Sequence, residues 1–177
     1  MLRLLLLIAG IALAACEQPM SPASGTIRVD QRMAAAPDPG FARALEVRPF
    51  DFPRDHGAHP DYATEWWYFT GNLRDAGGGL FGYQLTLFRV GLRPGDPLPD
   101  SRWRARQLYM GHLAISDIGA AMHYREERFG RAAAGLAGAA MDPLHEWLGP
   151  WSIRGADQGL FPLRLSAWTE DIALDLS

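Results

Sequence analysis

Alternation of apolar and polar residues dominates the chain from about residue 48 onward, and no long helical period appears there. The alternating runs are short, rich in aromatic and aliphatic residues, and separated by Gly, Pro and Asp turn signals, which is typical of β-strands. Strands are therefore predicted at residues 65–73, 80–90, 103–117 (one strand or two), 122–129, 151–154, 160–168 and 172–176.

The clearest pair of predicted strands is a hairpin. Residues 65–73 and 80–90 are joined by RDAGGG, whose glycines tolerate the positive φ angles that hairpin loops require. A Pro-rich loop follows at 91–102. The segment RAAAGLAGAA at 131–140 is predicted as a small-residue loop in preference to a short helix.

Seven or eight strands in meander order predict an all-β fold in which an antiparallel sheet curls into a barrel or half-barrel. The last strand pattern ends at Ser177, which would leave an unpaired sheet edge. We therefore expect the chain to be part of a longer protein.

The N-terminus has the pattern of a lipoprotein signal peptide over residues 1–15. Arg3 supplies positive charge, residues 4–13 form an apolar run too short to span a bilayer, and LAAC ends at Cys16. Cleavage before Cys16 and its lipidation would anchor the protein outside the cytoplasm, and Glu17 favours the periplasmic face of the outer membrane. The alternative is an ordinary signal peptide with an unrelated cysteine. Residues 16–44 are then a flexible tether, and 45–177 form the domain.

Composition narrows the class of partner. The chain has 177 residues and 48% apolar content, enough for one cored domain, and its formal charge is −3 without a basic tract, which argues against nucleic acid. All 17 cationic residues are Arg and none is Lys, which indicates a coding bias. Individual arginines are therefore not interpreted as anion-binding groups. Cys16 is the only cysteine, so no disulfide forms within the chain.

The stretch DHGAHPDYATEWWYFTGNL at 55–73 is dense in aromatic and titratable groups. Side chains alternate along a strand, so one face carries Glu65, Trp67, Phe69 and Leu73, and the other carries Trp66, Tyr68, Thr70 and Asn72. Both faces are largely apolar. We expect one face to meet a covering layer and the other to line a ligand cavity.

Glu65 is the first candidate catalytic residue, because a carboxyl beside two Trp rings would have a raised pKa and serve as a general acid. A salt bridge or a contact with backbone N–H groups is the alternative. His112 is the second candidate, with a satisfied core histidine as its alternative. The candidate ligand-binding residues are Trp66, Trp67, Tyr68 and Gln84, although large aromatics also serve as plain core material.

Other chemistries lack a motif. His56 and His59 lie three apart, which is not a zinc-binding pattern, and neither a metal nor a cofactor is expected. The chain has no GxSxG elbow, no nucleophilic cysteine, no phosphate-binding loop and no HExxH motif. Any catalysis would therefore use acid–base chemistry in an apolar pocket.

Four separate segments resemble, in order, the AttH/CrtC-like family of lipocalin-like proteins: FPRDHGAHPDYATEWWYFTGNL, FGYQLTLFR, LYMGHLAISD and ERFGRAAAGLAG. The resemblance runs from about Phe50 to the end. The family includes carotenoid 1,2-hydratases and secreted bacterial proteins labelled as hydrolases, and its members carry two successive lipocalin-like domains. The resemblance implies that this chain covers the first of the two.

The resemblance also implies a hydrophobic, isoprenoid- or lipid-like ligand. The hydratases protonate a terminal double bond and add water to the cation. In this chain Glu65 would be the acid, Trp66 or Trp67 would stabilise the cation, and Gln84 or His112 would position water. No family catalytic residue is carried over, and the hydrolase label finds no nucleophile. The alternative is a non-catalytic lipid carrier associated with an ABC-transporter permease.

Overall fold

The computed structural model describes residue 31 and residues 35–95, 102–141, 143–157 and 160–177. The chain divides into two units, Met1–Ala35 and Ala36–Ser177, and the strands described below belong to the second. The predicted signal peptide and Cys16 lie outside the described residues. None of the helices in the described part is long and apolar enough to cross a membrane.

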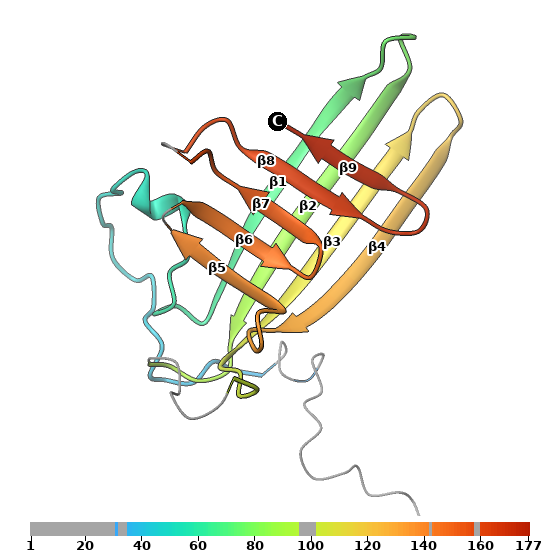
Figure 1. Ribbon diagram of the computed structural model, residues 1–177. Coiled ribbons are helices and arrows are strands. Elements are labelled where there is room, and N and C mark those ends of the chain that lie inside the picture. Colours follow the sequence, from blue (N-terminus) through green and yellow to red (C-terminus); the bar gives the residue numbers. More distant parts are fainter. Residues whose placement is uncertain (1–30, 32–34, 96–101, 142, 158–159) are drawn as a thin grey trace, which may run out of the picture. The chain divides into compact units, whose positions relative to one another are not determined.

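The first sheet contains four long strands in the order β1-β2-β3-β4, each antiparallel to the next (Figure 1). A single 3-10 turn, η1 (Arg54–His56), precedes it in the described chain. The strands are β1 (Thr64–Arg74), β2 (Leu80–Gly91), β3 (Gln107–Asp117) and β4 (Met122–Arg131).

The second sheet contains five shorter strands in the order β5-β6-β7-β8-β9, again antiparallel throughout. They are β5 (Ala137–Met141), β6 (Leu144–Leu148), β7 (Trp151–Arg154), β8 (Arg164–Trp168) and β9 (Ala173–Leu176). Within each sheet every strand pairs with its sequence neighbour, so each sheet is a meander.

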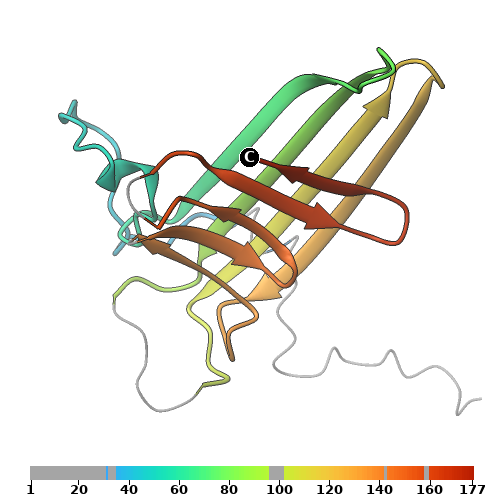
Figure 2. The ribbon, with the colours of Figure 1, turned by 45° about the horizontal axis from the view of Figure 1, so that its top comes forward.

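The two sheets pack face to face, with their strands crossing steeply (Figures 1 and 2). The apolar core between them draws on both sheets: Leu85, Leu87, Tyr109 and Leu113 from the first, and Ala137, Leu148, Trp151, Ile153, Leu165, Ala167 and Leu174 from the second. Burial of this apolar surface is the main stabilising term of such a sandwich.

Two glycines of the first sheet allow this close packing. A Cβ atom at Gly111 would lie 2.8 Å from the ring of Trp151, and one at Gly130 would lie 2.6 Å from a methyl group of Leu148. Both distances are too short for real atoms, so only glycine accommodates the large side chains of the second sheet at these points.

The predicted all-β antiparallel meander is confirmed, and the sheets do not close into a barrel within the described residues. The loop predicted over 131–140 was wrong for its second half, because β5 begins at Ala137. Strand β6 was not predicted at all. Both strands are short, and pairing with neighbours rather than intrinsic propensity holds them in the sheet.

The folded unit begins before residue 45. Phe41 is buried, and its ring occupies the space that a side chain at Gly91 would need. Ala42 forms a parallel bridge with Tyr62. The end of the segment predicted as a tether therefore packs against the domain.

Candidate functional site

Glu65, the second residue of β1, lies on the face of the first sheet that meets the second sheet. Its Oε1 atom is 2.8 Å from Nε of Arg89, its direct partner on β2. The backbone N–H of His59 donates to both carboxylate oxygens, at 3.0 and 2.8 Å. Glu65 also borders an open cavity of about 370 Å³ that Val47 and Phe50 line. The structure thus contains the ion pair and backbone contact that the sequence left open as the alternative to a general acid.

Arg89 is fully buried and holds the preceding loop against the sheet. Its Nη2 atom donates to the backbone carbonyls of His59 and Tyr62, both at 2.8 Å. Its Nη1 atom has no hydrogen-bond partner in the described part of the chain. The guanidinium therefore connects Glu65 to residues 59–62, and its Nη1 group is an unpaired buried donor.

Glu146 is a fully buried acidic residue at the centre of β6. It shares the inward face of the strand with the buried Leu144 and Leu148, and its cross-strand partners are Ala139 and Ile153. Neither carboxylate oxygen has a hydrogen-bond partner among the described residues. An unpaired buried polar group of this kind is rare and calls for a functional explanation.

Burial makes Glu146 a neutral acid. Removal of the carboxyl from water raises its pKa from an ordinary 4.5 to about 8, and the negative charge of Glu65 adds to the rise. Glu146 is therefore mostly protonated at neutral pH, although it lies on a sheet whose partner sheet carries a paired carboxylate.

Tyr109 connects these groups from β3. It is buried, and its hydroxyl donates to Oε1 of Gln107 at 3.1 Å. Burial raises the pKa of Tyr109 above its ordinary value; the positive charge of Arg89 opposes the rise, and the charges of Glu65 and Glu146 add to it. Glu65, Arg89 and Tyr109 are direct partners across β1, β2 and β3, and Glu146 acts on the phenol of Tyr109, so the four side chains share one interior region. We call Glu65, Arg89, Tyr109 and Glu146 the interior cluster.

A cavity of about 570 Å³ lies beside the interior cluster, at the edge strand β5. Much of its wall consists of alanine and glycine, from residues 132–135 and 137–139. Two lining residues touch the cluster: Ala139 pairs with Glu146, and Gln107 accepts the hydrogen bond of Tyr109. Directly paired strand residues have Cβ atoms ~5 Å apart, so Glu146 lies about one side chain behind the cavity wall.

His59 sits between two carboxylates in the loop before β1. Its Nε2 atom is 3.1 Å from Asp55 and its Nδ1 atom is 3.3 Å from Glu65. The hydrogen bond from Arg48 holds the pKa of Asp55 well below its usual range, and the Asp51 backbone N–H and His59 act in the same direction. No group of three or more His, Cys, Asp or Glu in the described chain is arranged to hold a metal ion.

Part of the outer face of the first sheet is apolar and open to the surface. Trp66 and Tyr68 are 62% and 52% exposed. The rings of Trp66 and Phe88 are 6.5 Å apart, and those of Phe88 and His112 are 5.3 Å apart. The strand register places Met110 and then Phe129 next to Phe88 in the same row. We call Trp66, Tyr68, Phe88, Met110 and Phe129 the outer patch.

Residues 43–177 match the model of the family described as AttH-like. The chain belongs to the AttH-like family. The AttH-like region therefore includes both sheets and the interior cluster. No curated protein matches the chain.

A solved structure shares the AttH-like fold. The crystal structure of a candidate AttH protein from Nitrosomonas europaea superposes with a TM-score of 0.62 and has 30% sequence identity. The match covers 76% of this chain and 39% of that one. The chain thus spans about two fifths of the length of that relative.

Within this AttH-like domain the predicted site residues fall on two sides of the first sheet. Glu65 and Trp67 face the second sheet, and the indole N–H of Trp67 donates to the carbonyl of His56 at 3.0 Å. The other candidates lie on the outer face: Trp66, Tyr68, Gln84 and His112. The two candidate catalytic residues, Glu65 and His112, are therefore not brought together, and the nearest carboxylate to His112 is Glu127, at 3.5 Å.

Sequence reasoning missed the other members of the interior cluster: Arg89, Tyr109 and Glu146. The segment LHEWL carries the one signal that points to Glu146, because a Glu two residues from a Leu on each side shares their face in a strand. Its five residues after Pro143 are too short to distinguish a strand from a turn. Arg89 offered no signal in a chain whose cations are all Arg.

Proposed function

We propose that this AttH-like domain binds a hydrophobic, isoprenoid- or lipid-like ligand and adds water to it by acid catalysis, in the manner of the carotenoid 1,2-hydratases that the sequence resembles. The supporting observation is Glu146, a neutral carboxyl without a hydrogen-bond acceptor, one side chain behind a cavity wall of alanines. A carbon–carbon double bond is a weak base, so its protonation needs an acid that no competing base has already deprotonated. Apolar burial provides such an acid at neutral pH.

The proposed reaction conserves the acid. Glu146 gives its proton to one alkene carbon, the π electrons form the new C–H bond, and the neighbouring carbon becomes a cation. Water attacks that carbon through oxygen and loses a proton to the Glu146 carboxylate, which restores the neutral acid. The aromatic ring of Tyr109, in the interior cluster, stabilises the positive intermediate.

The test is hydration of extracted isoprenoid lipids in isotope-labelled water, followed by mass spectrometry of the recovered lipid. The wild-type protein is expected to produce a lipid heavier by one labelled water. Glu146→Gln keeps the size of the side chain but has no acidic proton, so the rate should fall roughly 10²–10⁴-fold. Glu127→Gln, which removes an exposed carboxylate on the outer face, is the matched control and should retain activity.

Three results separate the alternatives. Product in the wild type but not in Glu146→Gln supports the proposal. Equal product in both proteins contradicts the role of Glu146. If Glu65→Gln abolishes product while Glu146→Gln does not, Glu65 is the acid after all, despite its ion pair with Arg89.

A second candidate function is non-catalytic binding of a lipid-like molecule, and the outer patch favours it. A contiguous exposed apolar surface marks a site of interaction rather than a solvated face. Retention of unaltered lipid by the wild type and by Glu146→Gln alike would support this carrier function. Loss of that retention in Trp66→Ala, without loss of stability, would locate the carrier site on the outer patch.

Membrane anchoring through Cys16, at the periplasmic face of the outer membrane, completes the proposal. In the carrier alternative, the anchored protein also associates with an ABC-transporter permease. A lipid tether keeps the domain close to apolar ligands that do not diffuse through water. Cys16→Ser is expected to move the protein from the membrane fraction to the soluble fraction and to abolish labelling with a radioactive fatty acid. Unchanged fractionation would contradict the anchor.

A further inference from the structure

Three arginines line the cavity beside β5. Arg102, Arg104 and Arg106 come from the segment that leads into β3, and the only carboxylate among the described lining residues is Asp61. None of the three forms an ion pair with a described acidic residue. The cavity therefore has an excess of positive charge that the described protein does not neutralise.

Four other arginines of the described chain pair with carboxylates: Arg48, Arg54, Arg89 and Arg164. The remaining described arginines outside the cavity form no ion pair with a described acidic residue. What distinguishes Arg102, Arg104 and Arg106 is that all three line one cavity.

Arg106 is the best placed of the three. Its Nη1 atom donates to the backbone carbonyl of Pro94, which fixes the guanidinium, while its Nε atom is buried without a hydrogen-bond partner in the described chain. A buried donor without an acceptor is costly, and an anion would remove that cost. Arginine is suited to this task because its planar group presents parallel N–H bonds to a carboxylate or phosphate.

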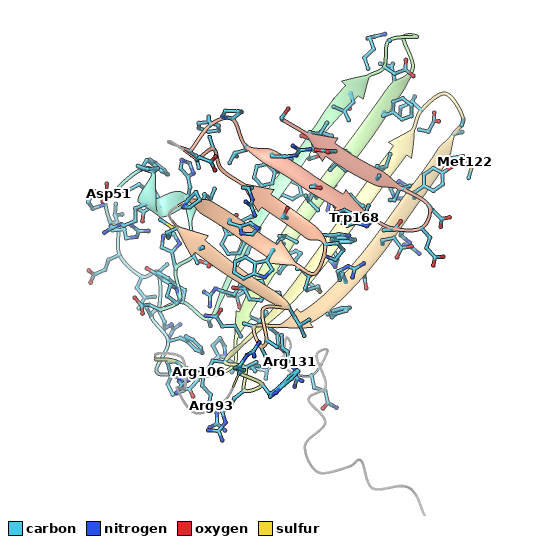
Figure 3. All side chains as sticks on the ribbon, viewed as in Figure 1. Asp51, Arg93, Arg106, Met122, Arg131 and Trp168 are labelled. Atoms are coloured by element: carbon cyan, nitrogen blue, oxygen red, sulfur yellow. The ribbon has the colours of Figure 1, made fainter. Side chains whose placement is uncertain are left out.

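The surroundings reinforce the positive charge. Arg93, Arg106 and Arg131 lie toward the same end of the first sheet, opposite the end that carries Met122 (Figure 3). The backbone N–H of Leu92 donates to the carbonyl of Arg106, and Arg131 pairs with Leu108 near the start of β3, which agrees with this placement. A cluster of like charges attracts ligands of opposite charge over a distance.

Part of the cavity wall is apolar. The indole ring of Trp147 packs against Gly138 on the outward side of β5, where a Cβ atom would be 2.4 Å from the ring, and its N–H donates to the carbonyl of Gly135 at 3.0 Å. The alanines of the same wall lead to Ala139, the strand partner of Glu146. Charge at one end and apolar surface at the other fit an amphiphilic molecule.

We propose that this cavity binds the anionic end of an amphiphile, a carboxylate or a phosphate, through Arg102, Arg104 and Arg106. The apolar part of the ligand then follows the alanine wall toward Glu146, and only this part of the inference rests on the proposed function. Among the described lining residues, Asp61 offsets one of the three positive charges, so this lining suits a ligand with one or two negative charges.

The experiment compares four probes by calorimetry at low and at physiological salt: a long-chain fatty acid, an alkyl phosphate, the alcohol of the same chain length, and inorganic phosphate. The fatty acid and the alkyl phosphate should bind, and the alcohol should bind at least about tenfold more weakly, since it lacks the charge. Physiological salt should lower the affinity of the charged probes and leave that of the alcohol unchanged.

Arg104→Gln and Arg102→Gln each remove one cavity charge, and each should lower the affinity for the fatty acid roughly tenfold. Arg74→Gln removes the charge of an exposed arginine at the other end of the first sheet, where it pairs with Leu80, and is the matched control. It should bind the fatty acid as the wild type does. Urea unfolding of each variant confirms that a lost affinity is not a lost fold.

Equal binding of alcohol and fatty acid, or equal affinity in Arg104→Gln and the wild type, overturns the inference. If inorganic phosphate binds as tightly as the alkyl phosphate, the apolar part of the ligand contributes nothing. The cavity is then a site for a free anion and not for an amphiphile. The hydration assay on an uncharged isoprenoid separates the two proposals. Fatty-acid binding without hydration leaves this inference standing and removes the proposed function, and the reverse result removes the inference alone.

Discussion

Glu65 and Glu146 belong to the same interior cluster but to different sheets, and their surroundings give them different hydrogen-bond partners. Glu65 faces a guanidinium at 2.8 Å and accepts two contacts from a backbone N–H. Glu146 has neither, and burial raises its pKa to about 8. One carboxyl therefore carries the contacts of an ion, and the other is a neutral acid.

The difference teaches which feature controls a buried carboxyl. Aromatic neighbours in sequence do not make an aromatic surrounding: Trp66 and Trp67 follow Glu65, yet Trp66 points to the opposite face of the sheet. For Glu146 it is burial that raises the pKa, with no donor in hydrogen-bond reach to favour the ionised form. Strand β6 offers its inward side chain only Leu, Ala and Ile neighbours.

Removal of Arg89 is expected to have the largest effect on folding stability. Arg89→Met is expected to destabilise the fold by about 3–5 kcal/mol, because it leaves Glu65 as a partly buried charge without its partner. It also removes the two contacts that hold the carbonyls of His59 and Tyr62. Urea unfolding followed by tryptophan fluorescence measures the loss. The double variant Arg89→Met with Glu65→Leu should recover part of it, and no recovery would mean that the loop contacts dominate.

Substitution of Glu146 sharpens the comparison through pH. Its folded pKa lies above the ordinary value, so the folded state binds more protons, and stability falls as pH rises from 4.5 to about 8. Each unit of pKa corresponds to about 1.4 kcal/mol. Glu146→Gln cannot titrate, so the urea midpoint should change less than in the wild type between about pH 5 and about pH 9. Glu127→Gln is the control and should keep the wild-type slope.

The smallest effect is expected at Asp55, on the loop side of Glu65. Its pKa is held well below the usual range by Arg48, so it contributes stability above its ordinary value of 3.8, and that contribution is lost as pH falls through the lowered pKa. Asp55→Asn should therefore be less stable than the wild type near neutral pH, and the difference should shrink in acid. A constant difference across the acid range would show that Asp55 acts through packing instead.

Much of the fold follows from local pattern. The hairpin of β1 and β2 and the strands β4, β7 and β9 have alternation or turn residues strong enough to predict from the sequence. The sequence also placed Glu65, Trp67 and Phe69 on one face and Trp66 and Tyr68 on the other, as the strand has them. Strand β5 escaped because AGAAM has low β-propensity and forms a strand only through pairing with β6.

The site was harder to predict because it depends on contacts between distant segments. Alternation separates the two faces of β1, but it does not tell which face the second sheet covers. Glu65 meets Arg89 across 24 positions, and Glu146 becomes neutral only because the first sheet buries it. The sequence predicted a general acid at Glu65. The protonated carboxyl in the same cluster is instead Glu146, on strand β6, which local pattern did not predict.

The most direct measurement is an NMR titration of the glutamate side-chain carboxyl carbons in the wild type and in Glu146→Gln. The account predicts one carboxyl in the wild type that titrates near pH 8 and is missing from the variant. If every glutamate carboxyl of the folded wild type titrates below about pH 6, Glu146 is ionised at neutral pH. The protein then has no neutral acid behind the cavity wall, and the central claim is contradicted.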